Sequence, residues 1–258
     1  MVTIRHQIAV DPAARPVARR RAWTIAATPA ALLSRVDGLI VAAAAIGGVV
    51  LVAADVTQRW ILPERTWTLD IDGRFNAETW FHSLVLAGAA LAALGIAASF
   101  SGQGRRVVLA WLFVGATLAF MSFDKSISFH ERLGQSLEET FELHEQAGRV
   151  LWQLVYAPLL ASFALAFLWC VRRERRARTW VIAGIAACAS KLLLEGLMFP
   201  LIKAGVTSEQ GVLYGIEANV EESVQLLGFA LFFGVLARLL IERVAALGPQ
   251  ILREARPD

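Results

Sequence analysis

Apolar residues gather in six runs of about twenty, separated by short polar segments. Each run is long enough for a helix to cross a bilayer core of about 30 Å. The runs cover about 36–56, 79–100, 107–127, 150–171, 179–201 and 220–241. The pattern predicts an all-α, polytopic membrane helix bundle with six transmembrane helices over 36–244. Residues 1–35 are expected to form a basic cytoplasmic tail and 245–258 a second tail.

Composition and charge support this class and suggest an orientation. The chain is 57% hydrophobic and 18% charged, with a mean hydropathy of +0.55. Arginines gather in the first tail, at 105–106, at 172–178 and after the last run. Six spans put all of these segments on one side, which the positive-inside rule assigns to the cytoplasm together with both termini. Topology therefore accounts for the net charge of +3, and no nucleic-acid partner is expected.

A short amphipathic helix is expected between the third and fourth runs, on the outer surface. Leu133, Leu137 and Phe141 repeat at helical spacing with acidic residues between them. The same segment carries His144 and Glu145.

Charged and polar residues occur at helical spacing within or at the ends of three of the apolar runs. These positions are Asp124, Ser128 and Glu131; Lys191 and Glu195; and Glu217, Glu221 and Gln225. Counting about 1.5 Å per residue from the arginines puts Asp124, Glu195 and Glu221 at a similar depth of about 25 Å, with Lys191 at about 20 Å. Because charge facing lipid is costly, the three carboxylates are expected to converge in a polar chamber open to the outer face, with His130 at its rim.

A plainer interpretation of these charges is ion pairing. Lys191 with Glu195, and Lys125 with a nearby acid, would then only tie helices together. His82, at the outer end of the second run, is interpreted as a solvated or hydrogen-bonded histidine. On a regular helix His130 points away from the face that carries Asp124.

Carboxylates together with imidazole are the usual ligands of zinc, iron and manganese, so a divalent metal ion is the candidate cofactor and a shared proton the alternative. The Glu-x-x-His spacing of di-metal helix bundles does not occur, and adjacent His and Glu residues point about 100° apart on a helix. The candidate ligands are Asp124, His130, Glu131, Glu195, Glu217 and Glu221, with Lys191, Ser128, His144 and Gln225 in support.

Two resemblances add to this interpretation. The run Ser126-Ile127-Ser128-Phe129-His130 resembles the Ser-x-x-x-His element of alkaline ceramidase-type membrane hydrolases, which implies a zinc-binding role for His130. Those enzymes carry His-x-x-x-His in their last helix, where this chain has Glu217 and Glu221.

A second resemblance is to uncharacterised bacterial inner-membrane proteins with six helices. It rests on Thr79-Trp80-Phe81, on Asp124 followed by His130 and Glu131, and on a last helix that begins rich in glutamate. It implies a place in the bacterial inner membrane and no particular activity.

Two classes of function stay open at this point. One is a polar-site protein, either a metal-dependent membrane enzyme or a carrier of a proton or cation. The other is a non-catalytic accessory subunit that packs beside a larger membrane complex through faces of small residues. Nucleotide-binding loops, Gly-x-Ser-x-Gly elbows and haem-attachment motifs do not occur in the sequence.

Overall fold

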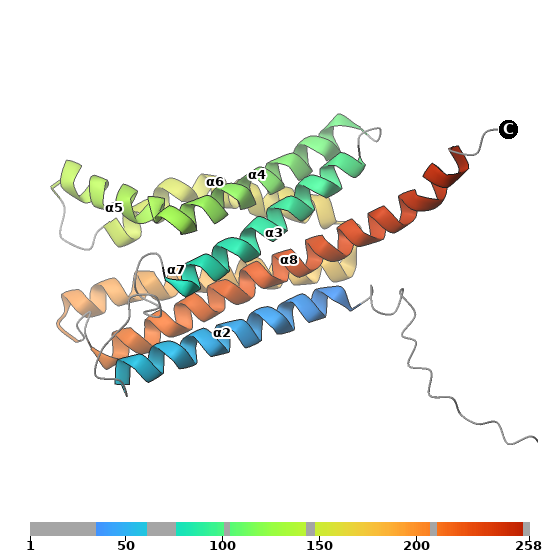
Figure 1. The fold of residues 1–258 in the computed structure, drawn as a ribbon. Helices are drawn as coiled ribbons and strands as arrows, with labels where there is room; N and C mark the ends of the chain where they lie inside the picture. The colour runs from blue at the N-terminus through green and yellow to red at the C-terminus, as the bar shows by residue number, and fades with distance from the viewer. Residues whose placement is uncertain (1–34, 61–75, 101–103, 143–147, 207–210, 255–258) are drawn as a thin grey trace, which may run out of the picture.

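Long helices make up the described part of the chain (Figure 1). The computed structural model describes residues 35–60, 76–100, 104–142, 148–206 and 211–254. The helices are α2 (Val36–Trp60), α3 (Ala77–Ser99), α4 (Arg105–Ile127), α5 (Phe129–Thr140), α6 (Gly148–Val171), α7 (Arg175–Lys203) and α8 (Val212–Glu254). Six of them, all except α5, are long and apolar enough to cross a membrane, which confirms the predicted fold class.

The predicted helix boundaries agree within a few residues except for the last span. We expected that span over 220–241, whereas α8 begins at Val212 and continues to Glu254. The polar residues Glu217 and Asn219 break the apolar run, although a helix tolerates them where they face other side chains instead of lipid. Asn219 donates hydrogen bonds to Asp55 and to the Gly215 carbonyl, so its amide group is partnered inside the bundle.

The short amphipathic helix between the third and fourth spans is confirmed as α5. It packs along α6, and Leu133 and Leu137 on its apolar stripe are half-buried. Phe141, just beyond its end, is 64% exposed. His144 and Glu145 lie outside the described residues.

Five long helices form a closed ring in the order α3, α4, α6, α7 and α8, with α8 returning to α3. Helix α2 lies outside the ring against α8, and much of its surface is exposed apolar side chain. Helices α7 and α8 approach closely at Gly184 and Gly228, where a Cβ on Gly228 would lie 3.0 Å from the Gly184 carbonyl oxygen. Close approach of this kind is what small residues permit in membrane bundles.

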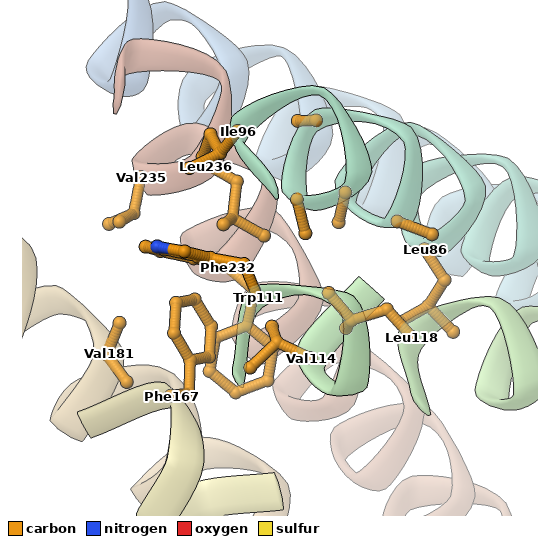
Figure 2. Close-up of a cluster of buried hydrophobic side chains, with 14 of the residues drawn as sticks. Leu86, Ile96, Trp111, Val114, Leu118, Phe167, Val181, Phe232, Val235 and Leu236 are labelled. Carbon is orange, nitrogen blue, oxygen red and sulfur yellow. The ribbon is translucent and has the colours of Figure 1, made fainter. Parts of the chain in front are cut away.

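An aromatic and aliphatic core fills one half of the ring (Figure 2). Phe167 and Phe232 are fully buried with ring centroids 5.5 Å apart, and Trp111 meets Phe167 edge-on at 6.2 Å. These residues come from the beginning of α4, the end of α6 and the second half of α8. The core therefore closes the ring at the end that carries the arginines.

Ion pairs join the helices at that same end. Arg238 of α8 contacts Glu174 at 2.7 Å and Asp37 at 3.4 Å, and Arg176 contacts Asp37 at 2.8 Å. Arg243 lies over the ring of Phe100 at 3.9 Å. The start of α2, the end of α3, the start of α7 and the second half of α8 therefore meet, and Arg176, Arg238 and Arg243 lie at one end of the bundle.

Candidate functional site

A polar chamber of about 600 Å³ occupies the other half of the ring. Its walls come from α3, α4, α5, α6, α7 and α8, and its lining includes Gln135, which is exposed on α5. Two lysines, Lys125 and Lys191, face into it. The acidic side chains that line it are Glu78, Asp124, Glu131, Glu138, Glu195, Glu217, Glu221 and Glu222. Eight carboxyl groups thus meet two ammonium groups in one enclosed space.

Asp124 is the centre of a buried hydrogen-bond cluster on one wall. It accepts hydrogen bonds from the His130 backbone amide at 2.9 Å and the Tyr156 hydroxyl at 3.0 Å, and its second oxygen lies 2.7 Å from His130 Nδ1. The His130 ring also packs on Trp152, with centroids 4.7 Å apart. Because Nδ1 faces Asp124, Nε2 is the ring nitrogen left for the chamber.

The expectation that His130 points away from Asp124 is wrong, because the helix does not continue through Ser128. That residue ends α4 and precedes α5 in the left-handed conformation, with φ 51° and ψ 45°. The chain turns there, so His130 comes back against the carboxylate six positions earlier. Ser128 itself lines the chamber beside them.

Lys191 joins the other two predicted carboxylates. Its Nζ lies 2.7 Å from Glu221 and 3.1 Å from Glu195, and the lysine is 5% exposed. Glu195 also accepts hydrogen bonds from Trp152 at 3.4 Å and Gln153 at 3.2 Å. The Lys191–Glu195 ion pair of the plainer interpretation is therefore present, inside the chamber that Asp124 also lines.

Glu217 extends this acidic wall by one helical turn. Its carboxyl group contacts that of Glu221. Glu217 Oε1 is buried and has no hydrogen-bond donor. Like charges at that separation disfavour full ionisation of both groups, so they need a proton or a cation nearby, and the Lys191 ammonium lies against Glu221. Glu131 and Gln225 also line the chamber, whereas His144 lies outside the described residues.

A second charged group, on the α3 side, was missed by the sequence interpretation. His82 is 1% exposed, and its Nδ1 lies 2.7 Å from Glu78 and 3.4 Å from Glu222. Lys125 Nζ lies 2.8 Å from Glu222, which confirms that this lysine pairs with a nearby acid. The spacing of Glu78 and His82, four apart on one helix, was the available signal. His82 is buried, so the solvated interpretation of it is wrong.

These three side chains also have the geometry closest to a metal site. Ligand atoms of Glu78, His82 and Glu222 lie within 4.8 Å of one another, the one such group of three in the described part of the chain. The candidates Asp124, His130, Glu131, Glu195, Glu217 and Glu221 share the chamber without forming a group this tight. Asp124 already accepts its hydrogen bonds, so it is better suited to orient His130 than to bind a metal ion directly.

Fold and site together define a polytopic membrane protein with an acidic chamber inside its helix ring. Residues 41–239 match the model of the family described as Domain of unknown function (DUF8692), and the chain belongs to that family. The match includes every chamber residue, so the chamber lies within the family's domain. This agrees with the expected resemblance to an uncharacterised family. No curated protein and no solved structure matches the chain.

Proposed function

We propose that this protein binds a divalent metal ion in its acidic chamber, near the periplasmic face of a bacterial inner membrane. The observation that carries the proposal is the charge imbalance, eight carboxyl groups against two lysines. Charge inside a membrane bundle must be neutralised by partners, and the two ammonium groups with the imidazoles of His82 and His130 neutralise four carboxylates at most. Oxygen and imidazole donors in one cavity suit zinc, iron or manganese.

The orientation follows from the arginines. Arg176 and Arg238 lie at one end of the bundle, and the chamber lies in the opposite half of the ring. The positive-inside rule assigns the basic end to the cytoplasm. The chamber then faces the periplasm and exchanges ions with that side, because the aromatic core around Phe167 and Phe232 separates it from the basic end.

The Asp124–His130 pair favours an enzyme over a simple binder. A histidine that gives Nδ1–H to a carboxylate has a fixed tautomer and an oriented Nε2. This is the arrangement of many general bases and metal ligands. A metal-dependent reaction on a substrate that enters from the periplasmic side fits this pair.

Metal content and affinity test the proposal. Detergent-purified wild-type protein should retain Zn²⁺ or Mn²⁺ after dialysis, as elemental analysis measures. Glu78→Gln removes the charge of a buried carboxyl group that lines the chamber, so it should weaken metal binding about tenfold in calorimetric titration.

Glu139→Gln is the matched control, since Glu139 is exposed on α5 and does not line the chamber. Wild-type protein that binds neither metal would contradict the proposal. The accessory-subunit interpretation would gain support if the chamber acids proved replaceable while deletion of the protein blocked assembly of a partner complex.

A further inference from the structure

The group formed by Glu78, His82 and Glu222 lies at the α3–α8 side of the chamber. The His82 side chain is 1% exposed, that of Glu78 5% and that of Glu222 16%. Carboxylate oxygen and imidazole nitrogen are both zinc ligands, and catalytic zinc sites use three protein ligands. The donor set is therefore complete for such a site, which leaves a further position for water or substrate.

Two atoms of this group are buried without a hydrogen bond. Glu78 Oε1 and His82 Nδ1 lie 2.7 Å apart, and neither makes a hydrogen bond of acceptable geometry. An imidazole nitrogen and a carboxylate oxygen that face each other with lone pairs repel, unless a proton or a metal ion lies between them. A proton or a metal ion therefore lies between the two atoms, and the group has the donors to bind either.

The helices hold these ligands in place. Glu78 and His82 are one turn apart on α3, whose first turn is capped by Asn76 accepting the Thr79 amide at 2.7 Å. The His82 ring meets Phe229 of α8 edge-on at 5.7 Å. Helices α3 and α8 pack along their length, so Glu222 is presented from a rigid neighbour. Ligands on packed helices are preorganised for an ion.

Lys125 of α4 is the cation now beside these carboxylates. Its Nζ lies 2.8 Å from Glu222 Oε2, 3.7 Å from Glu78 Oε1 and 3.2 Å from Gln225 Oε1. A tethered ammonium so close to both carboxylates competes with any metal ion for their charge. Lys191 likewise lies beside two carboxylates, those of Glu195 and Glu221. Neither of these belongs to the group of three side chains with metal-binding geometry.

We propose that Glu78, His82 and Glu222 are the ligands of the metal ion, and that Lys125 neutralises them when the metal is absent. This inference rests on the proposed function and names the site within the chamber. Glu78 and Glu222 both line the chamber, so the remaining coordination position is reached from there. A site with three protein ligands and one open position is of the catalytic kind.

Titration with Co²⁺ tests the site, because its visible spectrum reports ligand type and geometry as well as affinity. His82→Gln and Glu222→Gln should each weaken binding by more than about tenfold and change the spectrum, since loss of an outer partner alone costs that much. Glu195→Gln, the same change beside the other lysine, should leave the spectrum unchanged. Lys125→Met should strengthen binding at least about tenfold, and Lys191→Met should not.

The outcomes separate this inference from the proposed function. Wild-type protein that binds Co²⁺ with an unchanged spectrum in His82→Gln and Glu222→Gln would overturn the site and leave the proposed function standing. No binding by wild type or by Lys125→Met would overturn both. If the His82 variant does not fold, the Co²⁺ affinities of Lys125→Met and Lys191→Met are compared instead. Tighter binding by Lys125→Met would support the site, and equal affinities of the two variants would overturn it.

Discussion

Asp124 at the end of α4 caps α5, the next helix, through His130. One carboxylate oxygen accepts the His130 backbone amide at 2.9 Å, and the other lies 2.7 Å from the Nδ1 of the same residue. Ser128, at the N-cap position of α5, makes no side-chain cap hydrogen bond. The Asp124 carboxylate therefore replaces the missing side-chain cap, and its negative charge near the N-terminus of α5 is favourable. The same carboxylate also orients the imidazole ring of His130.

Asp124→Ala should lower the free energy of unfolding by about 2–4 kcal/mol, because it removes an acceptor that partners three hydrogen-bonding groups. Asp124→Asn should cost less, since it keeps one acceptor for the amide of His130 or the hydroxyl of Tyr156. Thermal unfolding in detergent measures both. Equal melting temperatures for wild type and Asp124→Ala would exclude the capping role.

The contact between α5 and α6 depends on two glycines. A Cβ on Gly134 would lie 2.5 Å from the Gly148 carbonyl oxygen, whereas a Cβ on Gly196 of α7 meets nothing within 4 Å. Gly134→Ala should therefore destabilise the protein by about 1–3 kcal/mol through overpacking. Gly196→Ala should stabilise it by up to about 1 kcal/mol through helix propensity. Melting temperatures that shift in the same direction would contradict this contrast.

The ion pairs at the basic end should be strongly coupled. Arg238→Met leaves Asp37, which is 1% exposed, and Glu174 without this partner, and should cost about 3–5 kcal/mol of stability. Arg175→Met, at an exposed position of α7, should cost less than about 0.5 kcal/mol. Adding Asp37→Asn to Arg238→Met should recover part of the loss in a double-mutant cycle. Strictly additive losses would refute the coupling.

The membrane orientation is testable with reporter fusions. A reporter joined after Asp258 should be active only in the cytoplasm, and one inserted in 207–210, between α7 and α8, only in the periplasm. Both expectations follow from six spans and from the arginines at one end of the bundle. Activity of the C-terminal fusion in the periplasm would reverse the orientation and place the chamber on the cytoplasmic side.

Much of the chamber was predictable because depth along a helix is nearly a linear count of residues. Asp124, Glu195 and Glu221 were expected at one level, and all three line the chamber. The Glu78–His82 pair was not recognised, because its spacing suits either a solvated helix end or a buried site. His82 is buried because α8 packs over it. The spacing of residues within α3 does not reveal which helix covers this face.

The hydrophobic pattern by itself determined the number and approximate positions of the membrane helices, because each span must be long and apolar to cross a bilayer. Together with the arginines it also predicts that the basic segments share one side of the membrane. Only the tertiary structure decided which charged residues meet. The turn at Ser128 brings His130 to Asp124, and the packing of α3 on α8 brings His82 between Glu78 and Glu222. Helical periodicity gives the face on which each residue lies within its own helix. Which residue of a neighbouring helix it contacts depends on how the two helices rotate and pack against each other.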